Sequence, residues 1–268
     1  MFYNGEIEIV RSRDPHVLQT SDILVDVGGE YDGVKKFDHH QSGGAGAHEN
    51  GIPYSSFGLI WKHYGEKLAG SAEVAQSIDE RLVQPIDAGD NGVETFSLVD
   101  ETAPYLLQDA ISIFGPTWNE KRTEDEGFFE VLEFAKKILS RAIVREQGAE
   151  EGKRIVEDVY QKSDDKRVIV LDSQYPWHQA LSAHPEPLYA VLPDRGETGN
   201  WKVEAVRDDP HSFQNRKSFP LSWGGKQGKE LAEISGVADA VFCHNNRFVA
   251  AAHSKEGALK LAMLAANA

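Results

Sequence analysis

The amino-acid sequence predicts an α/β protein, in which a domain built on a parallel sheet over residues 1–164 precedes a smaller α/β domain over residues 165–268. Three observations predict this fold class. Short runs rich in β-branched residues alternate with longer stretches of helical periodicity in the first part of the chain. The polar run Ser163-Asp164-Asp165-Lys166 marks a change in texture, after which strands dominate. The composition, with 40% hydrophobic and 26% charged residues, is that of an ordinary globular protein.

The first domain opens with alternating polar and apolar residues over positions 6–10, a pattern typical of a strand. The apolar run over residues 22–27 stops at Gly28-Gly29, which predicts a buried strand that ends in a tight loop. Helical periodicity begins at Ser55, and Gly70 is placed to end that helix. We therefore expect strands at residues 6–10, 22–27 and 34–39, and helices at 55–70, 74–86, 103–115 and 127–162.

The second domain has a different order of elements. Asn245-Asn246 separates two apolar runs and is a hairpin turn signal. The junction between two domains is a common place for a substrate cleft. We expect strands at residues 167–172, 188–192, 202–207, 240–244 and 247–252, and helices at 228–234 and 255–266.

The net charge is −15, and the excess of acid is confined to the first part of the chain. The first 164 residues hold 16 basic and 31 acidic residues, whereas residues 165–268 hold 12 of each. An acidic protein repels nucleic acid at long range, so stable binding to duplex DNA is not expected. We expect no signal peptide, because residues 1–6 show no basic region followed by an apolar stretch, and no membrane helix, because no apolar run reaches the ~20 residues that one needs. With Cys243 as its single cysteine, we expect a cytoplasmic protein that has no disulfide and no cysteine-based zinc site.

The residues that point to chemistry follow two neighbouring predicted strands. Asp26 lies at the end of the first, and Asp38, His39 and His40 lie at the end of the second. In open α/β sheets ligands bind at the carboxyl ends of the strands, so we expect Asp26 and His39 to lie close together. A carboxylate with an imidazole suits Mn²⁺ or Zn²⁺, and a carboxylate that bridges two metals can activate water against a phosphoryl group. On spacing alone, the alternative is a histidine pair in a surface loop beside a capping aspartate.

Further short motifs follow one another in order along nearly the whole chain. They occupy residues 11–15, 25–32, 38–41, 87–92, 116–119, 212–217 and 254–258. With its Asp38-His39-His40 run, the sequence resembles the DHH phosphoesterase superfamily and, within it, the melanocyte-proliferating-gene family of metal-dependent hydrolases and exonucleases. The resemblance implies a DHH-type parallel-sheet domain followed by a substrate-side domain.

The resemblance also implies roles for the four residues at the strand ends. Asp26 is expected to bridge two divalent metal ions, Mn²⁺ or Mg²⁺, and His39 to bind the second of them. His40 is expected to face the scissile phosphate. Asp38 is expected to orient the histidines, because metal-bound imidazoles usually need such a partner.

A further acidic ligand is expected from Asp87 or Asp90, and Asp90 is preferred because it sits where a predicted helix gives way to a turn. Members of the superfamily begin with a strand that ends in a His-x-Asp motif, whereas this sequence starts at what corresponds to their second strand. The resemblance implies a hydrolase of phosphodiester bonds, a 3′–5′ exonuclease or an oligonucleotide phosphodiesterase. The alternative is a truncated or non-catalytic relative that keeps the fold as a binding protein.

The second domain offers candidate groups for the substrate. Arg216 and Lys217 lie in a predicted loop and could clamp a phosphate. His253 precedes a helix whose first turn could bind an anion. With the acidic charge, these groups favour a short oligonucleotide or a small phosphorylated substrate, and homo-oligomer formation is left open. Three aromatic residues could stack on a base, although core packing is the expected role of each: Trp201, Phe213 and Trp223.

Overall fold

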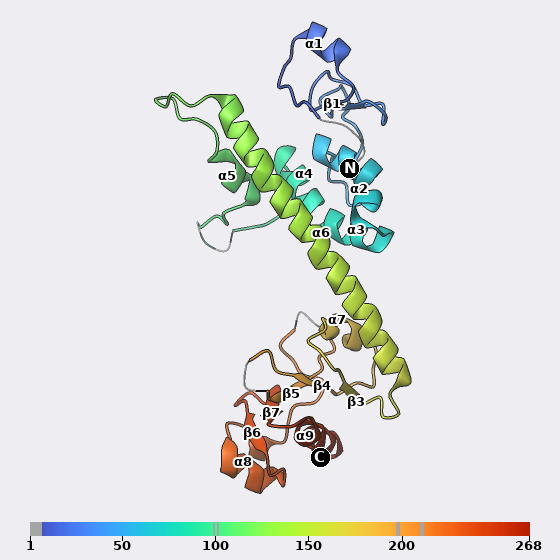
Figure 1. The fold of residues 1–268 in the computed structure, drawn as a ribbon, viewed down its shortest axis with the longest axis vertical. Helices are drawn as coiled ribbons and strands as arrows, with labels where there is room; N and C mark the ends of the chain where they lie inside the picture. The colour runs from blue at the N-terminus through green and yellow to red at the C-terminus, as the bar shows by residue number, and fades with distance from the viewer. Residues whose placement is uncertain (1–6, 99, 101, 197–198, 210–211) are drawn as a thin grey trace. The chain divides into compact units, whose positions relative to one another are not determined.

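The computed structural model describes residues 7–98, 100, 102–196, 199–209 and 212–268 of the chain (Figure 1). The chain divides into two compact units, Met1–Gln147 (unit 1) and Gly148–Ala268 (unit 2). The division falls inside the long helix α6, Glu124–Lys162, whereas the sequence places a domain boundary just after that helix, between residues 164 and 165. The boundary at 164 stays a prediction. Among the described residues, no helix is both long and apolar enough to cross a membrane.

Unit 1 contains a two-stranded parallel sheet, made of β1 (Leu24–Val25) and β2 (Lys36–Phe37). Each strand is shorter than the range predicted for it. β1 ends because Asp26 adopts a left-handed backbone with φ of 61°, and Gly28 and Gly29 continue with positive φ. This turn directs the chain away from the sheet and leaves the Asp26 side chain at its carboxyl end.

The strand predicted over residues 6–10 is wrong for the part of it that the structure describes. Residues 7–10 form no strand, and Ile7 and Ile9 have exposed fractions of 65% and 41%. Alternation of apolar residues makes a stable strand only where a neighbouring strand accepts its hydrogen bonds. The first regular element within the described residues is instead α1 (Pro15–Thr20), which Asp14 caps by accepting a hydrogen bond from the His16 N–H.

The other regular elements described in unit 1 are helices. α2 (Ser56–Ala69) begins after its N-cap Ser55 and ends at the left-handed Gly70, as the sequence predicts. The helix predicted over residues 74–86 is longer, because α3 passes through a π-helical turn into α4 and ends at Asp90. The bounds are α3 (Ala72–Ile78), the π-helical turn (Asp79–Val83), α4 (Gln84–Asp90) and α5 (Leu107–Ser112). The core between these helices consists of Trp61, Ala69, Val74, Ile78 and Val83, with Leu139 and Ile143 of α6 packed against it.

Unit 2 is built on a five-stranded sheet in the order β3-β4-β5-β7-β6. β3 and β4 pair in parallel and the other neighbours are antiparallel, so the sheet is mixed. The antiparallel β6–β7 pair confirms the hairpin predicted from Asn245-Asn246. The chain is thus α/β in the sense of mixed helix and sheet with parallel strand pairs. The strands are β3 (Val168–Val170), β4 (Tyr189–Pro193), β5 (Trp201–Ala205), β6 (Ala240–Cys243) and β7 (Val249–Ala252), and the helices are α7 (Trp177–Ser182), a 3₁₀ turn (Leu221–Trp223), α8 (Gly228–Ser235) and α9 (Lys255–Asn267).

Alternating side chains give the sheet of unit 2 a core on each face. Tyr189 and Val191 of β4 belong to the core that includes residues of α8 and α9. Ala190 and Leu192 belong to the core that includes residues of α7 and the last turns of α6. β4 is therefore buried on both faces, which explains why it reads as a continuous apolar run in the sequence.

At the N-terminus of α9, the carboxylate of Asp239 accepts hydrogen bonds from the N-cap residue, Ser254. Asp239 Oδ2 accepts hydrogen bonds from the Ser254 N–H (3.0 Å) and from the Ser254 hydroxyl (2.6 Å). Ser254 Oγ in turn accepts a hydrogen bond from the Gly257 N–H at 3.0 Å. A Cβ atom at Gly257 would lie 2.1 Å from Asp239 Oδ1, so this arrangement requires glycine.

We predict that Gly257→Ala lowers the free energy of unfolding by about 1–3 kcal/mol, because the added methyl group collides with a carboxylate held by two hydrogen bonds. Urea denaturation measures the effect. Gly148→Ala on α6 is the matched control, since a Cβ there meets nothing within 4 Å and alanine favours a helix by up to about 1 kcal/mol. Equal losses of stability in the two variants would contradict the geometry at α9.

Candidate metal centre

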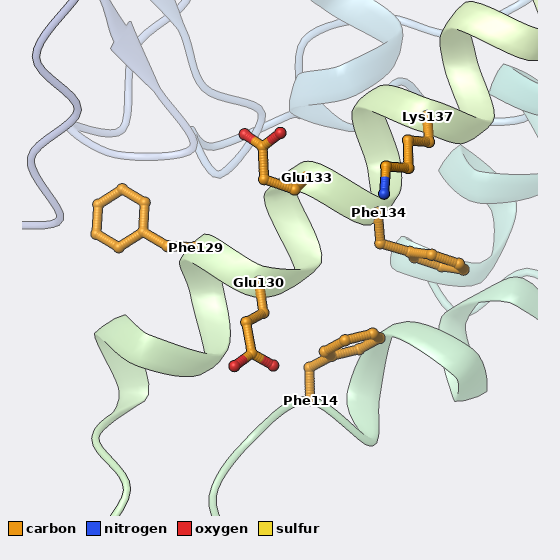
Figure 2. A pocket seen from close by; sticks show the side chains of 6 residues that line it. All are labelled: Phe114, Phe129, Glu130, Glu133, Phe134 and Lys137. Carbon is orange, nitrogen blue, oxygen red and sulfur yellow. The ribbon is translucent and has the colours of Figure 1, made fainter.

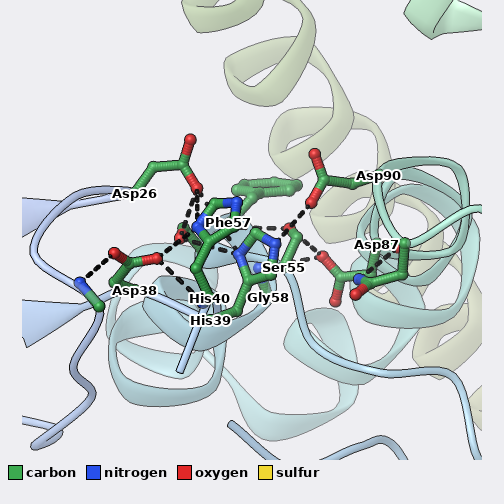
Figure 3. A network of polar contacts seen from close by, with 12 residues as sticks. Asp26, Asp38, His39, His40, Ser55, Phe57, Gly58, Asp87 and Asp90 are labelled. Carbon is green, nitrogen blue, oxygen red and sulfur yellow. Dashed lines mark hydrogen bonds and ion pairs between the residues drawn. The ribbon is translucent and has the colours of Figure 1, made fainter. Parts of the chain in front are cut away.

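The parallel pairing of β1 with β2 brings two short polar segments together at one edge of the sheet. Val25 pairs with Phe37, and the Asp26 N–H donates to the Phe37 carbonyl at 3.1 Å. The next residues of both strands therefore meet (Figure 3). Four of the predicted site residues each offer one possible metal-binding atom, and these atoms all lie within 4.8 Å of one another. They are Asp26, Asp38, His39 and His40.

Asp38 is buried and uses both carboxylate oxygens within the loop. Its Oδ2 accepts a hydrogen bond from the Gly29 N–H (2.6 Å), and its Oδ1 lies 2.6 Å from His40 Nδ1 and accepts the His40 N–H at 3.1 Å. Burial alone would raise the pKa of Asp38, but the hydrogen bonds from Gly29 and His40 outweigh it and hold the pKa below its usual value. The hydrogen bond to Asp38 raises the pKa of His40. These contacts support the expected role of Asp38 in orienting a histidine.

His39 is largely buried, and its two ring nitrogens have different surroundings. Nδ1 lies 3.2 Å from Ser56 Oγ and 3.6 Å from Asp26 Oδ1, whereas Nε2 lies 3.2 Å from Asp90 Oδ2. The Ser56 hydroxyl donates its only hydrogen to Asp26 Oδ1 at 3.0 Å, so toward His39 it can act only as an acceptor. Nδ1 must then carry a proton. In the neutral imidazole this leaves Nε2 as a lone pair that faces the Asp90 carboxylate.

Two acceptors that face each other at 3.2 Å need a positive charge between them, either a proton or a metal ion. The spacing is close to the about 3 Å that separates neighbouring ligands around one ion with bonds of about 2.1 Å. Asp26, with a side chain 59% exposed, lies on the Nδ1 side of His39 and belongs to the group of four residues described above, which does not include Asp90. The residues present thus fit a divalent cation with mixed nitrogen and oxygen ligands.

Asp87 and Asp90 lie one helical turn apart on α4 and have different environments. Asp90 is 47% exposed and lies beside His39, whereas Asp87 is fully buried. Asp87 Oδ1 accepts hydrogen bonds from the Ser55 hydroxyl (2.5 Å) and the Gly58 N–H (3.1 Å). Burial raises the pKa of Asp87 against the opposing effect of the hydrogen bonds with Ser55 and His48. Of the two carboxylates offered by the sequence, the structure places Asp90 at the histidine and turns Asp87 into the protein interior.

His48 fills the space on the other side of Asp87. Its Nε2 lies 2.7 Å from Asp87 Oδ2, its Nδ1 lies 3.4 Å from Asp79 Oδ2, and Tyr54 packs on its ring with centroids 4.2 Å apart. A Cβ at Gly58 would lie 1.9 Å from Asp87 Oδ2, so only glycine lets α2 approach this carboxylate. The packing fixes the start of α2 relative to α4.

Three residues of this site, Ser55, Ser56 and His48, received no role from the sequence. The signal for the serines is their position, since paired hydroxyl residues directly before a helical stretch combine an N-cap with a side chain at the first turn. The signal for His48 is weaker, because a histidine in a glycine-rich loop is usually exposed. The buried partners Asp87 and Asp79 come from elements that lie far along the chain, and no spacing rule connects them.

Two of the candidates for substrate binding in unit 2 make structural contacts there. The Arg216 guanidinium pairs with Asp208 (2.6 Å) and donates to backbone carbonyls, including those of His184 and Pro187 at 2.7 Å. Lys217 Nζ donates to the Ala266 carbonyl of α9 at 3.0 Å. Both side chains, which the sequence suggested as phosphate ligands, thus donate hydrogen bonds within the protein.

The other candidates in unit 2 differ in exposure. His253 is exposed and its Nδ1 lies 2.9 Å from Asn200 Oδ1, and the first turn of the following helix is closed by Asp239. Trp223 is buried in the core, as expected. Phe213 is 90% exposed beneath the Arg207 guanidinium, so the expectation of core packing is wrong for it. Trp201 packs at the margin of the core, with Lys255 Nζ over its ring.

Residues 3–266 match the family described as uncharacterised protein family UPF0160, MYG1 exonuclease. The chain is 31% identical to the MYG1 protein of Schizosaccharomyces pombe over 284 residues, which cover 95% of this chain and 87% of that protein. It is also 31% identical to the proteins called MYG1 exonuclease in Bos taurus and Homo sapiens, with 96% of this chain covered in both alignments and 76% and 77% of the relatives. No solved structure matches the chain.

We predict that Ser56→Ala releases the His39 tautomer and weakens binding of Mn²⁺ by about 10- to 100-fold, because the partner that requires a proton on Nδ1 is removed. ¹⁵N NMR of the metal-free protein at pH 8 reports the tautomer, and calorimetric titration reports the affinity. Ser55→Ala is the matched control: it removes an N-cap, with a loss of about 1 kcal/mol of stability, but leaves the tautomer unchanged. An unaltered His39 spectrum in Ser56→Ala would refute the assignment.

We predict that removing one carboxylate of α4 lowers mainly the stability of the protein and that removing the other weakens mainly its metal binding. Asp87→Ala leaves Ser55, Gly58 and His48 without their buried partner and should lower the free energy of unfolding by about 3–5 kcal/mol. Asp90→Ala, on the exposed side, should change it by no more than about 0.5 kcal/mol and should instead weaken Mn²⁺ binding. Urea unfolding of metal-free protein, followed by metal titration, tests both, and similar stabilities of the two variants would contradict the assignment.

Proposed function

The chain belongs to the MYG1 exonuclease family, UPF0160, and we propose that it is a metal-dependent hydrolase of phosphodiester bonds that acts as a 3′–5′ exonuclease or oligonucleotide phosphodiesterase. The observation that carries this proposal is the His39 site, where an imidazole lone pair and a carboxylate oxygen face each other at 3.2 Å beside a second carboxylate. The names of the bovine and human relatives support a nuclease-like hydrolase at the level of the family. The DHH superfamily is our proposal for the wider relationship.

His39, through Nε2, and Asp90 would hold the cation, and their mixed donors suit Mn²⁺ better than Mg²⁺, since Mg²⁺ prefers oxygen ligands. When bound, such an ion polarises a phosphoryl oxygen and lowers the pKa of a bound water. Ser56 holds the Nδ1 side of His39, so that Nε2 is the nitrogen presented to the ion. We also propose that Asp26 bridges to a second ion, a role that rests on the family resemblance alone.

His40 supplies a proton donor next to the metal ligands. Its Nδ1 is held by Asp38 at 2.6 Å, and its side chain is 58% exposed. The paired carboxylate raises the pKa of His40, which keeps a larger fraction of the ring charged near neutral pH. Nε2 has no partner among the described residues, so its N–H is free to donate to a phosphoryl oxygen or to protonate a leaving alkoxide.

The charge of the chain favours a small substrate. A net charge of −15 repels a long polyanion, and most of the acidic residues lie in the part of the chain that carries the His39 site. A short single strand or a small phosphorylated molecule carries fewer charges and can be held by the ion and His40 alone. Stable binding of duplex DNA is not part of the proposed function.

The test is hydrolysis of a short 5′-labelled single-stranded RNA with Mn²⁺, which should yield a ladder that shortens from the 3′ end and disappears with EDTA. His39→Ala should abolish the activity together with Mn²⁺ binding. His40→Gln should lower the rate by about 100-fold or more while Mn²⁺ binding is retained, since a positioned proton donor is worth that much. His16→Ala, on the exposed helix α1, is the control and should behave as wild type.

A wild-type protein that binds Mn²⁺ and is folded, but cleaves neither RNA nor bis(p-nitrophenyl) phosphate, would overturn the proposed hydrolase. It would then favour a binding protein that keeps the metal centre. Equal activity of wild type and His39→Ala would show that the cleavage comes from elsewhere.

A further inference from the structure

The first half of α6 presents an exposed face that combines aromatic and charged side chains. A hollow of about 470 Å³ lies on this surface, lined by residues of the helix and of the turn after α5 (Figure 2). The lining residues are Phe114, Phe129, Glu130, Glu133, Phe134 and Lys137. Phe129 is 45% exposed and Val144, four turns further along, is 51% exposed. Large apolar side chains that gather on an exposed helix face are typical of an interaction surface.

The charges on this half of α6 are sorted by sign. Residues 124–133 contain five acidic residues and no basic residue, whereas residues 136–145 contain four basic residues and no acidic residue. Lys137, Arg141 and Arg145 follow one another at intervals of four, so they lie on one side of the helix. None of the three forms an ion pair with another described residue. Like charges at this spacing destabilise an isolated helix, which calls for an anionic partner.

We propose that this face of α6 is a two-fold interface with a second copy of the chain, in which the two helices run antiparallel and cross near residues 133–137. A two-fold axis reverses the order of the charges, so the acidic turns of each helix meet the basic turns of the other. Glu133 of one copy then faces Lys137 of the second, and the reciprocal contact forms as well. Residues 124–145 span about 33 Å of helix, which gives an elongated contact. Phe129 and Phe134 would provide its apolar part.

The same cations could in principle contact the phosphates of a nucleic acid, but the surface favours a protein partner. Glu130 and Glu133 line the same hollow as Lys137, and three further acidic residues precede them within two turns. A polyanion along this helix would meet those carboxylates as well as the net charge of −15. A second copy supplies carboxylates for the unpaired cations and apolar surface for the phenylalanines, while Glu130 and Glu133 also pair with Arg122 and Lys136 of their own chain at 2.7 Å. This inference does not depend on the metal centre.

The experiment is sedimentation equilibrium with two charge-reversed variants of the full chain, E130K/E133K and K137E/R141E. Wild type should be a dimer, and each variant alone should dimerise at least ten-fold more weakly, because its two copies now present like charges to each other. An equimolar mixture of the two variants should form a one-to-one heterodimer, visible by native mass spectrometry, because all four contacts are again of opposite sign. Circular dichroism should show intact helix in each variant, since the substituted residues lie on the surface.

Lys229→Glu is the matched control, a charge reversal on the exposed side of α8 that should leave the dimer unchanged. A wild-type protein that remains a monomer at the highest concentration tested overturns the proposal, as does a dimer that both reversed variants keep. Fluorescence polarisation with single-stranded RNA completes the test. A monomeric wild type whose RNA binding is lost in K137E/R141E would assign the stripe to nucleic acid instead.

Discussion

The buried carboxylate of Asp87 is the contact on which the metal centre depends. It has no exposed surface, and it accepts or faces hydrogen-bond donors from two segments: Ser55 and Gly58 at the start of α2, and His48 in the preceding loop. A buried charge is tolerated only where its partners are in place, so these segments must assemble together. Their assembly also positions two residues that face the strand ends. Asp90 lies one turn along α4 from Asp87, and Ser56 follows Ser55 in the sequence.

Around His39 this framework produces a directional site. The Ser56 hydroxyl donates its hydrogen to Asp26 and therefore accepts a hydrogen bond from His39 Nδ1, which must carry the proton. Asp90 lies at the other ring nitrogen, Nε2. Asp38, directly after β2, likewise holds Nδ1 of His40. Each histidine thus has Nδ1 held by the protein, while Nε2 of His39 faces Asp90 and Nε2 of His40 has no partner among the described residues. The two-residue strands need supply no more than the alignment of Val25 with Phe37, because the hydrogen bonds after the strands fix the rest.

The sequence predicted those parts of the fold that depend on neighbouring residues. Ser55 and Gly70 bounded α2 correctly because capping is a local property of the backbone, and Asn245-Asn246 predicted the β6–β7 hairpin for the same reason. The strand over residues 6–10 failed because pairing depends on a distant partner. At the site, the cluster of Asp26 with His39 and His40 follows from the strand ends, but the contrast between Asp87 and Asp90 does not. Both are acidic residues on one apolar helix, and only the position of α2 makes one of them interior.

The contacts in unit 2 bear on where a phosphate can be recognised. Arg216 is engaged by Asp208 and by backbone carbonyls, Lys217 by the end of α9, and the start of α9 by Asp239. Groups that bind phosphate in other settings here satisfy carboxylates and carbonyls of the chain itself, and releasing them would leave buried acceptors without partners. In the proposed hydrolase, recognition of a phosphodiester would then rest mainly on the candidate cation site and on His40 in unit 1. A site with so few positive groups, in a chain of net charge −15, can hold the end of a short strand but gains little from each further phosphate. The same shortage of positive charge makes the unpaired basic stripe of α6 conspicuous, and its position after the acidic turns matches the charge order of an identical helix running in the opposite direction.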